Sequence, residues 1–272
     1  MEKWKIEKYK KISKEVRREI LEMVYRTKSP HIGSSLSLVE ILVALYFRFL
    51  RISPKNPRDK FRDRLILSKG HACHALYATL FKRGFLDRKV LNGFAIDGGT
   101  LAQHPNSKPE WGIEISTGSL GHGLSIGAGM ALAQKHDKLN SRTFVIMGDG
   151  ELEEGSIWEA AMFAAHHKLD NLVGIVDNNQ LQFFGRTKEI VSLEPLSLKW
   201  QAFGWEVREV DGHDFKGLIA TFKKIPFKKG KPSLVLAHTT KGKGISFMED
   251  NYIWHSKYPD EEEYRKALKE LL

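Results

Sequence analysis

Residues 143–180, TFVIMGDGELEEGSIWEAAMFAAHHKLDNLVGIVDNNQ, form the stretch that decides the fold. The apolar run TFVIM leads into GDG at 148–150, and a second apolar run, LVGIVD, leads into the asparagine pair at 178–179. The segment between them, residues 153–168, has the pattern of a helix. A strand, a helix and a strand in this order predict a right-handed parallel crossover. Such a unit brings the carboxyl ends of both strands to one edge of a sheet, where α/β proteins bind ligands.

Both strand ends carry oxygen ligands. Asp149 offers a carboxylate and Asn179 an amide oxygen, and such oxygens suit a hard cation such as Mg²⁺, whose octahedral shell is completed by phosphates and water. The glycines beside Asp149 allow close backbone approach, and the start of the next helix can hold a diphosphate. A Gly-Asp-Gly turn alone is weak evidence, because such turns occur wherever a loop needs positive φ. Its pairing with the asparagines indicates a metal-diphosphate site.

The rest of the chain extends the same alternation of strands and helices. Apolar runs that lack polar alternation, separated by helical patterns, are typical of a parallel sheet covered on both faces. The sequence therefore predicts an α/β fold with a doubly wound, mostly parallel sheet. The expected strands are RLILS, TFVIM, LVGIVD, WEVREV and SLVLAH, and the expected central helices are residues 119–136, 153–168 and 214–224.

Helices are also expected at both ends of the chain. Residues 4–26 place apolar side chains at helical spacing, and Ser37 with Glu40 has the spacing of a capping box before an apolar helix that continues to about Leu50. The tail YPDEEEYRKALKELL begins with a Pro-Asp start signal and predicts a final helix. Trp158 and the AAMFAA run at 160–165 are expected to belong to the core.

The composition bounds the class of protein. The chain has 272 residues, 42% of them hydrophobic, and shows no repeat or long linker, so we expect one large domain over residues 1–272. The single cysteine, Cys73, excludes an internal disulfide framework and fits a reducing compartment, which favours the cytoplasm. The N-terminus lacks the apolar core of a secretory signal.

Two classes of partner are disfavoured. The run LSLVEILVALYFRFL is interrupted by Glu40 and Arg48 and is interpreted as a buried helix too short to span a bilayer, so no membrane association is expected. The net charge of +10 invites nucleic-acid binding, but the lysines are scattered and no zinc-finger, KH-type or RNP-type signature is present. Small anionic substrates fit this charge better than nucleic acid.

Several stretches carry a resemblance to a known family. GDGELEEGSIWEAAMFA followed by LDNLVGIVDNNQL is similar to the thiamine diphosphate signature, and the chain resembles the N-terminal half of transketolases. Six further blocks resemble transketolase blocks in the family's order. They are SPHIGSS, DRLILSKGHA, LAQHP, STGSLGHGLSIGAGMA, VDGHD, and TTKGKG with WH downstream.

The resemblance implies a set of site residues. The cation, Mg²⁺ with Ca²⁺ or Mn²⁺ as substitutes, would be bound by Asp149, Asn179 and the backbone carbonyl of Leu181. Four loop histidines would hold sugar hydroxyls and relay protons as catalytic residues: His31, His71, His104 and His255. The thiamine diphosphate contacts would be Ser34, His71, Gly118, Ser119, Leu120, Gly150, Asn179, Lys241 and His255.

The other histidines receive a structural interpretation, because imidazoles often fill cores and surfaces. These are His74, His136, His166 and His167. Three positions depart from the family pattern: Pro30 replaces a usual glycine, His122 a common glutamine, and Phe183-Phe184 a more polar Gly-Gln pair. The departures bear on substrate contacts more than on the cofactor.

The resemblance also implies a reaction and a partner. In transketolases the glutamate that activates thiamine diphosphate belongs to a pyrimidine-binding domain, which these 272 residues lack. The chain is therefore interpreted as the N-terminal subunit of a split transketolase, whose C-terminal partner supplies that domain and its glutamate, in a two-plus-two heterotetramer. Together they would transfer a two-carbon ketol unit from a ketose phosphate, such as xylulose 5-phosphate, to an aldose phosphate, such as ribose 5-phosphate.

The sequence leaves other functions open. One is a different thiamine diphosphate activity, either 1-deoxyxylulose-5-phosphate synthase-like or that of a 2-oxo acid dehydrogenase α chain, although the histidine set argues against the latter. Another is a non-catalytic subunit that binds the cofactor as a scaffold or sensor. A dinucleotide-binding Rossmann interpretation is weaker, since GSLGHG lacks the expected glycine order and a preceding strand.

Overall fold

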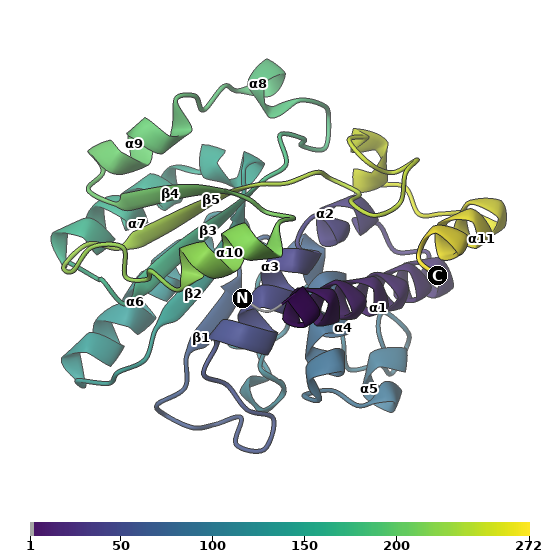
Figure 1. Cartoon of the computed structure of the whole chain (residues 1–272), viewed down its shortest axis with the longest axis horizontal. Helices are drawn as coiled ribbons and strands as arrows, with labels where there is room; N and C mark the ends of the chain where they lie inside the picture. The colour runs from purple at the N-terminus through teal and green to yellow at the C-terminus, as the bar shows by residue number, and fades with distance from the viewer. Residues whose placement is uncertain (1–2) are drawn as a thin grey trace.

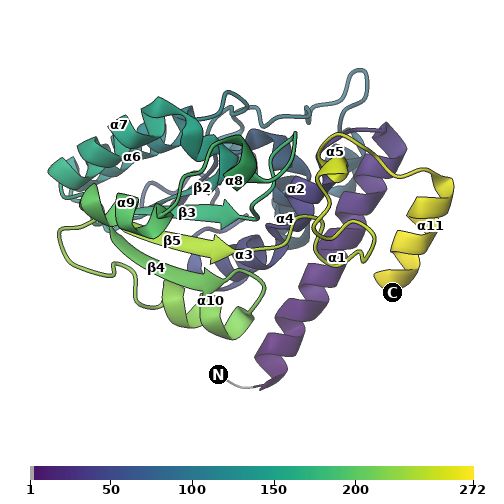
Figure 2. The ribbon, with the colours of Figure 1, turned by 90° about the horizontal axis from the view of Figure 1, so that it is seen from above.

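The computed structural model describes residues 3–272 and contains a five-stranded parallel sheet with helices on both faces (Figures 1 and 2). The strand order is β1-β2-β3-β5-β4, and every neighbouring pair is parallel. The predicted fold class and all five predicted strands are confirmed. The strands are β1 (Arg64–Leu67), β2 (Thr143–Gly148), β3 (Leu172–Asn178), β4 (Glu206–Asp211) and β5 (Ser233–His238).

The sheet separates two hydrophobic layers, because successive side chains of a strand point to opposite faces. In β2, Phe144 and Ile146 pack with α1, α3, α4 and α10, whereas Val145 and Met147 pack with α6, α7 and α9. Figure 2 shows the sheet between these two groups of helices. Their bounds are α1 (Lys3–Thr27), α3 (Val39–Ala44), α4 (Cys73–Arg83), α10 (Phe215–Phe222), α6 (His122–His136), α7 (Gly155–His166) and α9 (Leu196–Ala202).

Shorter helices complete the fold around this sheet. Helix α11 packs beside α1, where the rings of Tyr25 and Tyr264 stack with centroids 4.0 Å apart. Its N-cap Asp260 forms a capping box with Glu263, which confirms the predicted start of the final helix. The remaining α-helices are α2 (Ile32–Leu36), α5 (Arg88–Asn92), α8 (Thr187–Ile190) and α11 (Glu261–Glu270).

The capping box expected at Ser37 and Glu40 is wrong. Ser37 follows α2, and its hydroxyl donates to the buried carboxylate of Asp177 at 2.7 Å and lies 3.1 Å from the carbonyl of Ser34. Glu40 instead pairs with Arg17 of α1. Tertiary partners have therefore displaced the local cap. The apolar helix nevertheless reaches Phe49 as expected, through α3 and a π-helical turn.

The expectation that the apolar segment near the N-terminus is too short to span a bilayer is wrong. Within residues 3–272, Ile32–Phe49 is long and apolar enough to cross a membrane by length and composition alone, contrary to the expectation from the shorter run. In the structure 83% of this segment is buried inside the protein.

Helix α7 departs from its expected core role on one side. Its alanines Ala160, Ala161 and Ala164 are buried against the sheet, and Trp158 packs partly against the same cluster. Met162 and Phe163 are 54% and 41% exposed. The prediction that the whole AAMFAA run is core is therefore wrong for these two side chains.

Candidate active site

A cavity of about 400 Å³ lies at the carboxyl ends of β2 and β3. The sheet brings the two motifs of the opening stretch together here, as the crossover predicts. Ser119 is exposed on the adjacent loop and does not line the cavity. The other expected site residues all line it: His31, Ser34, His71, His104, Gly118, Leu120, Asp149, Gly150, Asn179, Leu181, Lys241 and His255.

Hydrogen bonds hold each of the expected cation ligands in place. Asp149 is buried, and its carboxylate accepts from the backbone N–H groups of Gly150 (2.9 Å) and Gln180 (2.5 Å). The side-chain oxygen of Asn179 accepts from the N–H of Leu181 at 3.1 Å. Burial raises the pKa of Asp149 to about 6, and the nearby charge of Asp177 adds to the rise. Backbone N–H groups thus hold this carboxylate in place.

The donor set fits a hard divalent cation bound together with a phosphate ligand. Within residues 3–272 no cluster of three or more His, Cys, Asp or Glu side chains could hold a metal ion. What the edge offers is one carboxylate, one amide oxygen and the carbonyl of Leu181, and Mg²⁺ typically combines one or two carboxylates with phosphate oxygens and water. A cation here would also favour the charged form of Asp149.

Two buried lysines, Lys69 and Lys241, line this cavity. Lys241 is fully buried, and its ammonium donates to the carbonyl of Leu181 at 3.0 Å. Burial lowers the pKa of Lys241 to about 7, and the charge of Lys69 lowers it further. Lys69 is buried as well and pairs with Asp177 at 2.6 Å. Lys241 therefore supplies a donor whose positive charge an anionic ligand would stabilise.

Asp177 is buried beside the cavity, where it bonds to the cavity residues Lys69 and Asn179, and sequence reasoning missed it. This wholly buried carboxylate accepts from Lys69, from Ser37 (2.7 Å), from Thr239 and from the amide of Asn179 (3.2 Å). Burial would raise its pKa, but the charge of Lys69 and these hydrogen bonds lower it. A charged residue at the end of an otherwise apolar, fully buried strand was the available signal.

Glu151 is a second residue that sequence reasoning missed. Its buried carboxylate accepts from Ser68 and from the backbone N–H groups of Gly121 (3.0 Å) and Gly148 (3.1 Å). It therefore ties the glycine turn before α6 to the turn after β2. Burial raises the pKa of Glu151 above its ordinary value. Glu154, by contrast, is the N-cap residue of α7 and makes no side-chain cap bond.

Four histidines face one another across the cavity. The ring centroid of His31 lies 5.2 Å from that of His71, 6.2 Å from that of His104 and 5.1 Å from that of His255. Burial and neighbouring positive groups lower the pKa of His31 to about 4 and that of His255 to about 2, and they also lower the pKa of His71. These three rings are thus neutral at pH 7, able to accept or donate hydrogen bonds to hydroxyl groups.

Two neighbouring phenylalanines, Phe183 and Phe184, lie beside the histidines of the cavity. Phe183 lines the cavity with its ring centroid 5.3 Å from that of His255, and it touches Phe184, which is 81% exposed. Farther along the same loop, Arg186 pairs with Asp250 at 2.8 Å. This ion pair joins the loop after β3 to the loop after β5.

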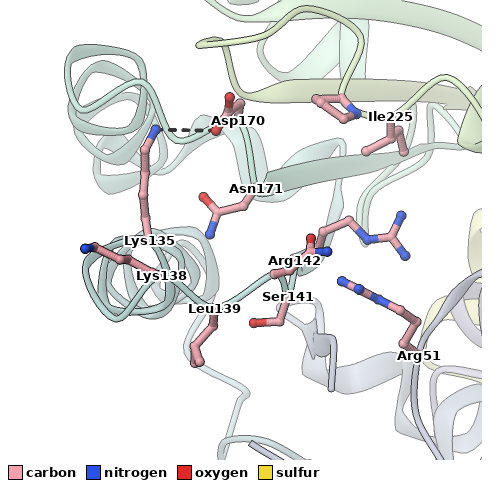
Figure 3. Close-up of a pocket in the computed structure, with 11 residues that line it drawn as sticks. Arg51, Lys135, Lys138, Leu139, Ser141, Arg142, Asp170, Asn171 and Ile225 are labelled. Carbon is pink, nitrogen blue, oxygen red and sulfur yellow. Dashed lines mark hydrogen bonds and ion pairs between the residues drawn. The ribbon is translucent and has the colours of Figure 1, made fainter. Parts of the chain in front are cut away.

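The opposite, amino edge of the sheet holds a larger and more open depression of about 700 Å³ (Figure 3). Its cations are largely matched by carboxylates. Arg51 and Arg142 share the buried Asp63, at 3.0 and 2.7 Å, and Lys135 pairs with Asp170 at 3.3 Å. This depression therefore carries mostly paired charges, whereas the cavity at the carboxyl edge holds the buried Asp149 and Lys241.

Comparisons with known proteins agree with this geometry. The family model described as transketolase, thiamine diphosphate binding domain, matches residues 8–271. An apulose-4-phosphate transketolase subunit of Phocaeicola vulgatus is 47% identical over 259 residues, which cover 95% of this chain and 92% of that protein. The 6-deoxy-6-sulfo-D-fructose transketolase subunit SqwG of a Clostridium species is 44% identical, with 94% of this chain and 93% of that protein covered.

Solved structures show the same relationship. The transketolase of Campylobacter jejuni superposes with a TM-score of 0.90 at 31% identity, and that of Leishmania mexicana with a TM-score of 0.90 at 28% identity. Each match covers 97% of this chain, which spans 42% and 41% of the two solved chains respectively. The cavity, the order of the motifs and these matches lead to one conclusion: the chain belongs to the transketolase family and contains its thiamine diphosphate-binding domain.

Proposed function

We propose that this chain is the N-terminal subunit of a split transketolase and that it transfers a two-carbon ketol unit together with a C-terminal partner subunit. The observation that carries the proposal is one cavity in which the oxygens of Asp149, Asn179 and Leu181 and the ammonium of Lys241 lie beside a cluster of neutral histidines. One end of this cavity suits a metal-bound diphosphate, and the other suits polyhydroxylated substrates.

The residues divide into two roles. Asp149, Asn179 and the carbonyl of Leu181 would hold Mg²⁺, and Gly150 with Lys241 would contact the diphosphate. When bound, thiamine diphosphate supplies the electron sink for breaking and forming the carbon–carbon bond. The chain's own contribution is to orient the cofactor and to exclude water from a mostly buried site.

The histidines would act on the sugar. His31 and His255 would hold the donor hydroxyls and move a proton near the reacting carbon; both are neutral at pH 7 and line the same cavity, which supports this role. His71 and His104 would extend this set of hydrogen bonds. Sugar phosphates with several adjacent hydroxyls are the substrate class that such a cluster fits.

We propose xylulose 5-phosphate as donor and ribose 5-phosphate as acceptor for the first assay. The names of the two relatives report other ketoses, apulose 4-phosphate and 6-deoxy-6-sulfo-D-fructose, so these belong in the same donor panel. The proposal of a partner draws support from relatives of similar length that are named as subunits. That partner would supply the pyrimidine-binding domain and its glutamate in a two-plus-two assembly.

The test is a ketol-transfer assay with thiamine diphosphate and Mg²⁺, run on the chain alone, on the candidate partner alone and on their mixture. Activity only in the mixture is the expected result. Appreciable turnover by this chain alone would refute the dependence on a partner. Decarboxylation of pyruvate without use of any ketose would favour the synthase-like alternative, and cofactor binding without any turnover would favour a non-catalytic subunit.

A further inference from the structure

The backbone around Lys241 is fixed from outside the cavity. The N–H of Thr240, the residue before Lys241, donates to Nε2 of His213 at 2.8 Å. Two residues after Lys241, the carbonyl of Lys243 accepts from Nε of Arg17 at 2.8 Å. Lys241 is therefore bracketed by two side chains that come from other segments of the chain.

Glu40 connects Arg17 and His213, the two side chains that hold the turn around Lys241. One of its oxygens accepts from Arg17 at 2.6 Å, and the other accepts from Arg17 at 2.8 Å and from Nδ1 of His213 at 2.9 Å. Burial would raise the pKa of Glu40, but the charge of Arg17 and the hydrogen bonds from both partners lower it to about 2. Glu40 thus stays a carboxylate at every pH at which the protein would be assayed.

These contacts assign the tautomer of His213. A backbone N–H can only donate, so Nε2, which faces Thr240, must carry no proton. The proton of the neutral ring then lies on Nδ1 and is donated to Glu40. His213 therefore donates one hydrogen bond, to Glu40, and accepts one, from Thr240.

Neither His213, Glu40 nor Arg17 lines the cavity. The hydrogen bond of His213 to Thr240 reaches the site through the turn that carries Lys241, whose next residue, Gly242, donates its N–H to the carbonyl of Gly33 at 3.0 Å. An added Cβ at Gly244 would lie 2.6 Å from Nε of Arg17, so the turn passes too close to the guanidinium to shift toward it.

We propose that His213 is a positioning residue for Lys241: through the N–H of Thr240 it holds the turn so that the Lys241 ammonium faces the diphosphate end of the cavity before the cofactor arrives. This inference rests on the proposed function, in which Lys241 contacts the diphosphate. The competing role for His213 is purely structural, as one member of a buried ion-pair network that stabilises the fold.

Two substitutions separate these roles, because each keeps one of the two hydrogen bonds. In His213→Asn the side-chain amide can still donate to Glu40 but cannot reach Thr240. In His213→Gln the side-chain oxygen can still accept from Thr240, while the bond to Glu40 is lost. The exposed His136 on α6 provides matched controls, His136→Asn and His136→Gln.

The experiment measures the Kd of thiamine diphosphate by calorimetry at saturating Mg²⁺, on each variant chain combined with its partner subunit, together with the Tm. We expect Kd to rise about three- to tenfold in His213→Asn, the effect of losing one hydrogen bond, and to stay unchanged in His213→Gln and in both controls. Equal changes in the two His213 variants, or changes in Kd that follow the Tm, would overturn the proposal.

A double-mutant cycle tests the route of the effect. In a Lys241→Ala background, His213→Asn should no longer alter the Kd of thiamine diphosphate, because its effect passes through Lys241. Additive losses of affinity would contradict this route.

Hydrogen exchange tests the preorganisation of the turn on the unsubstituted complex. The backbone N–H groups of residues 239–244 should already be protected from exchange without cofactor, and rapid exchange there would overturn the proposal. A wild-type complex that binds no thiamine diphosphate would instead refute the proposed function, and this inference with it.

Discussion

The ammonium nitrogen of Lys241 lies 2.9 Å from Nδ1 of His255. The same ammonium donates to the carbonyl of Leu181, so this lysine links the loop after β3 to the histidine cluster of the cavity. Burial lowers the pKa of His255, and the charge of Lys241 lowers it further. His255 therefore presents a neutral ring to the cavity.

Replacing His255 with Ala should lower the kcat of ketol transfer by about 100-fold or more, the usual contribution of a proton-transferring residue. The Kd of thiamine diphosphate should change much less, because Asp149, Asn179 and Lys241 remain. Steady-state kinetics and calorimetry on the complex give the two numbers. His136→Ala, on the exposed end of α6, is the control. Unchanged turnover in His255→Ala would remove this residue from the mechanism.

Removal of the divalent cation should abolish cofactor binding. Chelation of the purified complex is expected to raise the Kd of thiamine diphosphate beyond measurement, and Mg²⁺, Ca²⁺ or Mn²⁺ should restore cofactor binding.

Asp149→Asn should weaken the binding of thiamine diphosphate by about tenfold or more, since it removes the one carboxylate of the donor set. Calorimetry is the measurement, and Asp137→Asn, an exposed carboxylate on the surface, is the control. Full affinity in the presence of chelator would contradict the cation site.

Two glycines of α6 should respond in opposite directions to the same change. A Cβ added at Gly127 would lie 2.5 Å from a methyl group of Val145, whereas one at Gly129 meets nothing within 4 Å. Gly127→Ala should therefore lower the free energy of unfolding by about 1–3 kcal/mol through overpacking. Gly129→Ala should raise it by up to about 1 kcal/mol, because alanine favours the helix. Urea unfolding measures both, and equal effects would show that α6 can move away from β2.

His74 should make the stability depend on pH. It is fully buried between the hydroxyls of Ser29 and Ser35, at 2.9 and 3.2 Å, and burial lowers its pKa from 6.5 to about 3. Below pH 6.5 the unfolded chain binds a proton that the folded state rejects, so stability falls as the pH decreases from 6.5 toward 3. Between pH 7 and pH 5 this one group should cost about 2 kcal/mol.

The variant His74→Gln tests whether His74 causes this loss of stability at lower pH. It removes the titrating ring but keeps polar atoms for Ser29 and Ser35, so its free energy of unfolding should decrease less between pH 7 and pH 5 than that of the unsubstituted chain. Urea unfolding at the two pH values gives the comparison. His136→Gln, at an exposed position, should behave like the unsubstituted chain, and identical pH slopes for all three proteins would contradict the prediction.

The strands and the edge that carries the site could be predicted from sequence because their signals are local. An apolar run ends in a glycine turn or an asparagine pair, and the crossover rule then brings the two ends together. Helix α4 gave no comparable signal, since its residues from Cys73 to Leu80 are buried all round and show no polar face. The short helices α5, α8 and α9 depend on packing for their stability.

The polar residues that hold the site could not be predicted, because their partners are far away in sequence. Ser37 has the spacing of a helix cap, yet it donates to Asp177, and Glu151 follows the glycine turn but bonds across to Gly121. Nothing near Lys69 in the sequence indicates that it is buried against Asp177.

For protein engineering, one buried carboxylate beside the cavity should be left alone, and two neighbouring phenylalanines can be changed. Asp177 is saturated by donors from four segments of the chain, so any substitution there would strand several buried polar groups at once. Phe184 is 81% exposed, and Phe183 beside it is 46% exposed. Libraries that vary residues 183 and 184 can therefore change the surroundings of the cavity with little loss of stability.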